Sequence, residues 1–274
     1  GYLDEWRRSK DELERDFAAI QSMSIDGRSV TEPMRTRKPV VSWDDILVMG
    51  SQLARMPLND DEAVTTRTVI GPAARNPLVI ETPVYVSHMS FGALSKEAKL
   101  AIAMGSAAVE TAMCSGEGGI VPDALEAAHR YIFEYVPNRY SVTEENLRKV
   151  DAVELKIGQS AKPGMGGHLP GAKVTAEIAE IRGFAAGEAI TSPARFPDIS
   201  DAATLRQKVE WLRESSGGKP IGIKLAAGHI ELDLDFCLDV GCNFCQANRS
   251  ARHEYRINAA FVCQPLHAGT DRGG

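Results

Sequence analysis

From Pro83 onwards, the chain repeats one unit: a short apolar strand, a loop and an amphipathic helix. The segment PVYVSHMS opens the first unit, and PIGIKL at 220–225 is the clearest buried strand. Strands that alternate with helices indicate a parallel sheet or barrel. A closed barrel of this kind needs eight strands, whereas five or six can be counted before Gly274. The expected fold is therefore α/β: an incomplete TIM-type (β/α) barrel.

The barrel segment is expected to span residues 83–242. Residues 1–82 are predicted to form an extension, with a helix at 2–20, a helix that Ser42 begins, and short strands at 65–70 and 78–81. Within the barrel segment, Ser95 is predicted to cap a helix from Lys96 to about 107, and Thr143 a helix that runs to Val150. Further helices are predicted at 174–182, 201–213 and 230–239. Residues 243–274 are polar without a clear period, and we expect an atypical tail there.

The stretch from Val153 to Gly171 begins as a strand and becomes a glycine-rich loop. Lys156 lies within that strand, and a lysine in an apolar strand is costly unless it meets an anion or a carboxylate. The glycines that follow allow backbone N–H groups to approach a ligand closely. Since α/β folds place their chemistry at the carboxyl ends of the strands, we expect a binding loop here.

Three motifs resemble one family. KIGQSAKPGMGGHLPGAKV (156–174) is similar to a segment of the synthase domain of glutamate synthase, although His168 replaces the usual glutamine. SHMSFGALSKEA (87–98) resembles the first strand and loop of that domain, and SGEGG (115–119) resembles its second. The similarity extends over roughly 66–241 and is greatest to the short, stand-alone relatives. It implies a barrel that binds FMN and converts 2-oxoglutarate into glutamate.

The resemblance also implies substrate-binding residues. Gln159 and Lys162 match the family's pair for the dicarboxylate, because an amide and an ammonium group donate to carboxylate oxygens and to the keto oxygen under attack. Ser192 is expected beside them. Glu117 in SGEGG is the candidate for acid–base chemistry or for guiding ammonia, and it shares the catalytic role with Lys162. The alternatives are a lysine that only solvates a loop and a carboxylate in a solvated turn.

Five further residues are expected to contact the flavin. Lys156 and Lys224 lie near strand ends, where a cation stabilises the anionic reduced ring. Met89, Ser90 and Gly92 resemble the platform beside the ring. Lysines that extend from barrel strands towards solvent, and a methionine that packs in the core, are the alternative interpretations.

The pair Cys242 and Cys245 could also bind a metal ion, with Cys263 and His267 as further ligands. The alternative is thiols that carry no metal. The family's iron–sulfur cysteines belong to a later region, so neither an iron–sulfur cluster nor another metal site is predicted.

The implied reaction is the reductive amination of 2-oxoglutarate. No Gly-x-Gly-x-x-Gly fingerprint and no amidotransferase segment are recognisable, so glutaminase-type and electron-donating subunits are expected to supply ammonia and electrons. A net charge of −6 argues against nucleic acid, no apolar run predicts a membrane span, and the cysteine pattern favours the cytoplasm. Two alternatives stay open: an N-methylglutamate synthase-type subunit, and an inactive remnant, since the expected phosphate loop after residue 242 is not recognisable.

Overall fold

The computed structural model describes residues 17–27, 43–45, 47–160, 165–250 and 256–262. The chain divides into two compact units, Gly1–Met34 and Arg35–Gly274. In the first unit, helix α2 (Phe17–Asp26) is described. The rest of the helix predicted at 2–20 lies outside the described residues.

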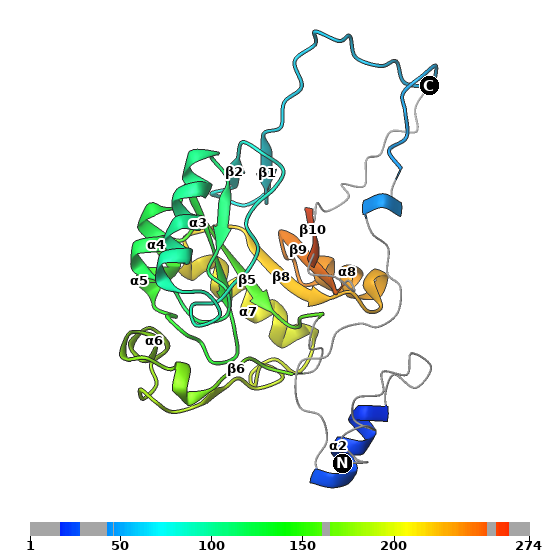
Figure 1. Ribbon diagram of the computed structural model, residues 1–274. Helices are drawn as coiled ribbons and strands as arrows, with labels where there is room; N and C mark the ends of the chain where they lie inside the picture. Colours follow the sequence, from blue (N-terminus) through cyan, green and yellow to red (C-terminus); the bar gives the residue numbers. More distant parts are fainter. Residues whose placement is uncertain (1–16, 28–42, 46, 161–164, 251–255, 263–274) are drawn as a thin grey trace. The chain divides into compact units, whose positions relative to one another are not determined.

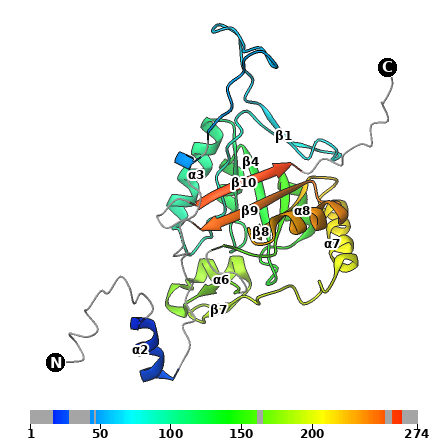
Figure 2. The ribbon, with the colours of Figure 1, turned by 90° about the vertical axis from the view of Figure 1, so that its right-hand side faces the viewer.

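The second unit is built on a six-stranded sheet (Figures 1 and 2). Its parallel strands are β3 (Ala112–Cys114), β4 (Arg130–Tyr135), β5 (Ala152–Lys156), β8 (Ile221–Ala226) and β9 (Phe244–Ser250). Each pairs with the next in chain order, as in a (β/α) barrel. Strand β10 (Arg256–Val262) then pairs antiparallel with β9. The curled half-barrel confirms the predicted fold class.

Helices pack on the outer face of this sheet. They are α3 (Lys96–Ala108), α4 (Pro122–Ala127), α5 (Glu144–Lys149), α7 (Ala202–Ser215) and α8 (Ile230–Asp239). Helix α6 (Ala176–Arg182) lies against the loops at the carboxyl ends, where Arg182 Nη2 donates to the Phe91 carbonyl at 2.7 Å. Ser95, Thr143, Thr175 and Asp201 each cap a helix by accepting from a backbone N–H group. The predicted caps Ser95 and Thr143 are confirmed, and the helices predicted from 174 and 201 begin at Ala176 and Ala202. Phe133, Leu155 and Ile223 of the sheet and Leu205 and Val209 of α7 lie in one buried core. Each such side chain contributes about 1.5–3 kcal/mol.

The inner face of the sheet carries a second, smaller core at the amino ends of the strands. Ile132 and Phe244 pack there with Ile70, Leu78 and Ile80 of the hairpin formed by β1 (Thr68–Ile70) and β2 (Leu78–Ile80). This hairpin therefore closes the amino end of the half-barrel and leaves the carboxyl ends for the site.

The predicted helix that Ser42 begins is wrong over 47–56. A short 3₁₀ helix η1 (Trp43–Asp45) is present, but no helix follows, and Leu47, Met49 and Leu53 are 89%, 92% and 94% exposed. Short helices gain most of their stability by packing an apolar face against the rest of the protein, and no described residue covers the apolar side chains at 47–56.

Two further segments differ from expectation. PVYVSHMS was expected to be a full strand, but only Val86 forms a bridge, to Met113. The polar stretch after residue 242 showed no period, yet it contains all of β9 and of β10. None of the helices in the described ranges has the length and apolarity needed to cross a membrane.

Candidate active site

Charged side chains occupy the inner face of the half-barrel towards the carboxyl ends of its strands. Glu134 of β4 is in register with Glu154 of β5, and Lys156 of β5 with Lys224 of β8. Because side chains alternate along a strand, Glu154 and Lys156 share one face. Glu134, Glu154 and Lys224 are buried, and the Lys156 side chain is 9% exposed. An ion buried without a partner costs several kcal/mol, so each of these groups requires a counter-charge.

Glu134 is the centre of this network. Its Oε1 lies 2.7 Å from Lys224 Nζ and 3.9 Å from Lys156 Nζ, while its Oε2 lies 3.4 Å from His88 Nδ1. Burial alone would raise the pKa of Glu134, but His88 and the two lysines outweigh it and hold the pKa well below its usual range. Glu134 is therefore a carboxylate that neutralises the cations around it.

His88 joins the two glutamates. Its Nε2 forms an ion pair with Glu154, and its Nδ1 faces Glu134. Burial lowers the pKa of His88, but Cys114 and the carboxylates of Glu134 and Glu154 outweigh this effect and keep the pKa well above its usual value. His88 is thus an imidazolium. The Gln246 amide, in the orientation that satisfies its neighbours, donates to Glu154 Oε2 at 2.9 Å.

Glu117 forms the outer part of the site. Its carboxylate pairs with Lys156 Nζ and accepts from the backbone N of Gly167 at 3.1 Å. Burial raises the pKa of Glu117, but Lys156 outweighs it, so the pKa lies below its ordinary value. A Cβ at Gly167 would lie 2.3 Å from Glu117 Oε1, so this approach requires glycine. The loop after β5 is thereby joined to the loop after β3.

The predicted flavin platform lies on the same edge. Lys99 Nζ donates to the Met89 carbonyl at 3.0 Å and to the Ser115 carbonyl at 2.7 Å, and burial lowers the pKa of Lys99 to about 8. A Cβ at Gly116 would lie 2.4 Å from the Met89 carbonyl carbon, so the backbone segment at Met89 and Ser90 packs directly on the SGEGG loop. Gly92 has φ +109°, a conformation that favours glycine.

Of the three predicted substrate residues, the structure describes Ser192 and Gln159 but not Lys162. Ser192 is buried, follows β7 (Ile190–Thr191), and accepts from Asn138 Nδ2 at 3.1 Å. Its backbone N donates to the Gly167 carbonyl at 2.7 Å, which brings it to the Glu117 loop. Gln159 is half-buried in the loop after β5. Lys162 lies outside the described residues, so the convergence of Gln159, Lys162 and Glu117 stays a prediction.

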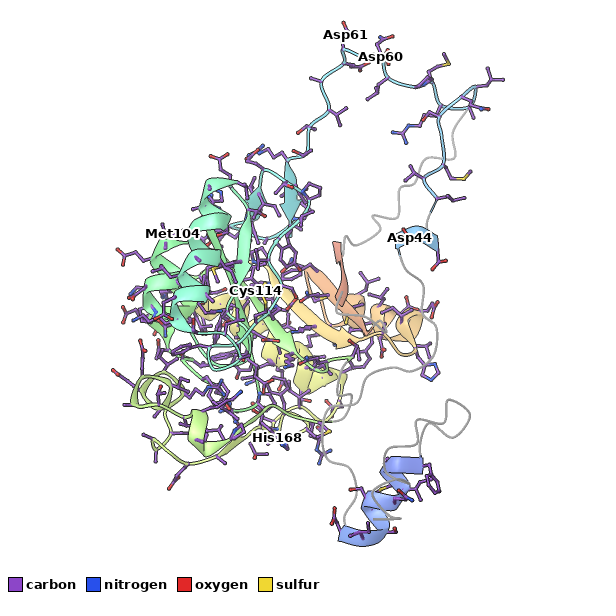
Figure 3. All side chains as sticks on the ribbon, viewed as in Figure 1. Asp44, Asp60, Asp61, Met104, Cys114 and His168 are labelled. Carbon is purple, nitrogen blue, oxygen red and sulfur yellow. The ribbon has the colours of Figure 1, made fainter. Side chains whose placement is uncertain are left out.

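His168 is exposed on β6 (His168–Leu169), which pairs antiparallel with β7 (Figure 3). A Cβ at Gly166 would lie 1.9 Å from the Ser192 carbonyl oxygen. The glycine run before His168 therefore lets these two loops approach each other.

Sequence reasoning missed the inner members of the network: His88, Lys99, Glu134, Glu154 and Gln246. A signal was available for one of them. Glu154 stands two residues before Lys156, so the strand period places both on one face. The other four become neighbours only through strand pairing and helix packing.

This donor set suits one part of a flavin. Two ammonium groups and a strand-end backbone can hold the edge of a planar ring that becomes anionic on reduction. For the phosphate, flavin barrels use loops after the last strands. The segments that follow β9 and β10, at 251–255 and 263–274, lie outside the described residues, so the described cradle concerns only the ring part of such a site.

Comparison with known proteins identifies the family. A family model described as a conserved region in glutamate synthase matches residues 18–246. A glutamate synthase large subunit-like protein of Rhizobium meliloti is 33% identical over 211 residues, which cover 76% of this chain and 48% of that protein. An archaeal glutamate synthase [NADPH] of Methanocaldococcus jannaschii is 44% identical over 153 residues, which cover 56% of this chain and 30% of that protein. An archaeal-type glutamate synthase [NADPH] of a Thermotoga species is 35% identical over 222 residues, which cover 80% of this chain and 41% of that protein.

Among solved structures, a mandelate oxidase mutant with an FMN adduct aligns with a TM-score of 0.42 at 14% identity, covering 69% of this chain and 53% of that one. The chain spans about half or less of the length of the curated relatives it matches. The family match itself covers most of the sequence, including every strand and loop of the candidate site up to β9. The chain therefore belongs to the glutamate synthase family and contains its conserved region.

Proposed function

We propose that this chain is the glutamate synthase-type flavin oxidoreductase domain that aminates 2-oxoglutarate reductively to L-glutamate. The observation that carries the proposal is the pair formed by Glu117 and Lys156, held by Gly167 at the carboxyl edge of the half-barrel. The pair joins the SGEGG loop to the strand and glycine loop that resemble the same family. The names of the relatives support the same reaction class.

FMN is the proposed cofactor, and when bound it supplies a hydride. Lys156 and Lys224 would lie at the edge of the ring that gains charge, and Met89, Ser90 and Gly92 would lie beside it. In this structure Glu117 and Glu134 neutralise the two lysines. The carboxylates therefore limit how strongly the lysines favour an anionic ring, and they keep both cations in place before the ring arrives.

Gln159, Lys162 and Ser192 are the proposed substrate contacts. An amide, an ammonium group and a hydroxyl together can donate to the two carboxylates and the keto oxygen of 2-oxoglutarate. When ammonia attacks the keto carbon, the C=O π electrons pass to the keto oxygen and the nitrogen becomes positively charged. The nitrogen must then lose protons while the oxygen is protonated and leaves as water, which gives an imine. Glu117 is suited to accept a proton from the nitrogen, because Lys156 keeps Glu117 ionised.

Ammonia and electrons would come from partner subunits of glutaminase and electron-donating type. Two relatives are named as NADPH enzymes, and we propose that electrons reach this chain through another polypeptide or domain. The pattern of cysteines supports a cytoplasmic location.

The test begins with the purified chain and added FMN. Flavin binding is measured by fluorescence quenching, followed by glutamate formation from ammonia and 2-oxoglutarate with chemically reduced FMN. Glu117→Gln should reduce turnover by about 10²–10⁴-fold. Glu144→Gln, which removes a surface carboxylate paired with Arg148, is the matched control and should leave turnover unchanged.

Product formation from methylamine and glutamate, but not from ammonia and 2-oxoglutarate, would assign the chain to the N-methylglutamate synthase type. A folded chain that binds no FMN would identify it as an inactive remnant. Either result would contradict the proposal.

A further inference from the structure

Three buried cysteines gather on the outer face of the sheet, opposite the charged site. Cys237 lies in the last turn of α8, Cys242 in the turn that follows, and Cys245 on β9, with exposed fractions of 3%, 6% and 0%. All three belong to the apolar core between the sheet and its helices. The sequence had suggested Cys242 and Cys245, with Cys263 and His267 as further ligands. Cys263 and His267 lie outside the described residues, and the fold adds Cys237.

The three sulfur atoms are spaced to share one ion. They all lie within 4.8 Å of one another, and Cys242 Sγ is 3.4 Å from Cys245 Sγ. A metal bound at about 2.3 Å by three thiolates in one plane separates those sulfurs by about 4 Å. Small rotations of the side chains therefore suffice for binding. A multi-iron cluster would hold its cysteines farther apart, so the geometry favours a single ion.

The backbone fixes two of the ligands relative to the third. Gly241, at φ +76°, makes the turn from α8 into β9, and its N–H donates to the Leu238 carbonyl at 3.0 Å. Cys242 N then donates to the Cys237 carbonyl at 3.2 Å. Asn243 N donates to the Ile221 carbonyl at 2.7 Å and fixes the chain that follows to β8. The thiols are thus positioned before any ion binds.

Two arginines from α7 supply positive charge beside this turn. Arg213 Nη2 donates to the Gly241 carbonyl at 2.5 Å, and Arg206 Nη2 donates to the Asp239 carbonyl at 2.7 Å. Their guanidinium groups offset the partial negative charge at the end of α8. Nearby cations also favour thiolates, and three thiolates with one monovalent ion carry a net charge of −2.

The ligand set selects the ion. Thiolates are soft ligands that prefer Cu(I) or zinc, but structural zinc takes four ligands. Within the described residues the group consists of three side chains, in an apolar surrounding that disfavours a water as the fourth ligand. We propose that Cys237, Cys242 and Cys245 form a three-thiolate site for Cu(I). Binding would release the protons of the thiols to solvent, without a redox step.

The test is an anaerobic titration of the reduced full chain with Cu(I) against bathocuproine disulfonate, a coloured chelator. One Cu(I) per chain should be retained. Cys237→Ser, Cys242→Ser and Cys245→Ser should each weaken binding by more than the roughly 10–100-fold that loss of an outer-shell partner costs. Cys114→Ser is the matched control, because Cys114 is a buried thiol on the inner face of the sheet (Figure 3).

Copper X-ray absorption on the unsubstituted protein tests the site without any change to the core. The proposal predicts a shell of three sulfur atoms. It would be overturned if the chelator removed all copper, if Cys237→Ser bound Cu(I) like the unsubstituted chain, or if Cys263→Ser abolished binding. Tighter binding of zinc than of Cu(I) by the same thiols would also overturn it.

Discussion

Replacing Glu134 by Gln tests the physical basis of the site. The substitution keeps the side-chain shape but removes the charge that faces Lys224 at 2.7 Å, His88 at 3.4 Å and Lys156 at 3.9 Å. Removing one member of a buried ion pair costs about 3–5 kcal/mol, because the remaining charge stays buried without compensation. A chain of this size loses about 2–4 °C in melting temperature per kcal/mol. The expected loss is therefore about 6–20 °C.

The assay is chemical and thermal unfolding followed by circular dichroism, with Glu144→Gln as the surface control. The pKa of Glu134 is depressed, so its contribution to stability is present above the unfolded-state value of about 4.3 and is lost as the pH falls through the lower folded value. The gap between the unsubstituted chain and Glu134→Gln should therefore close in acid. A loss no larger than that of Glu144→Gln at neutral pH would refute the network.

Three other predictions follow from the same contacts. Gly167→Ala places a Cβ 2.3 Å from Glu117 Oε1, so the carboxylate must move by about 1 Å to reach ordinary contact. Turnover should therefore fall, while circular dichroism should show that the fold survives. His88→Gln should destabilise the chain most below pH 6.5. The pKa of His88 is raised in the folded chain, so its stabilising contribution is complete below pH 6.5 and is lost as the pH rises through the folded-state pKa. Urea titrations at several pH values measure this dependence. Burial lowers the pKa of Lys99 from 10.5 to about 8. The free energy of unfolding of the unsubstituted chain, relative to that of Lys99→Met, should therefore increase as the pH rises from about 8 to 10.5. A difference that does not change with pH would contradict this prediction.

Much of the fold could be predicted from the chain because local signals were strong. Ser95, Thr143 and Asp201 are N-caps whose side chains satisfy backbone donors, and each begins a helix as expected. The apolar segment at 220–225 forms β8. The helix predicted over 47–56 failed because its apolar period has no described surface to pack against, and periodicity alone does not stabilise a short helix.

The site was harder to predict than the fold. The motifs identified Glu117 and Lys156, and the position near a strand end identified Lys224. A strand lysine was expected to need an anion or a carboxylate, and Lys156 and Lys224 indeed pair with Glu117 and Glu134. Pairing between strands is a long-range property, so the register that sets Glu134 beside Lys224 could not be derived from either strand alone. Gln159 and Lys162 stay predictions.

The proposed role of Glu117, ionised beside Lys156, is to accept a proton from the ammonia nitrogen at a flavin site. The most direct measurement is the incorporation of isotope-labelled ammonium into glutamate by the chain with 2-oxoglutarate and reduced FMN, compared with Glu117→Gln at equal FMN occupancy. The account predicts labelled glutamate from the unsubstituted chain and a loss of about 10²–10⁴-fold in the variant. Equal incorporation by both proteins would contradict it.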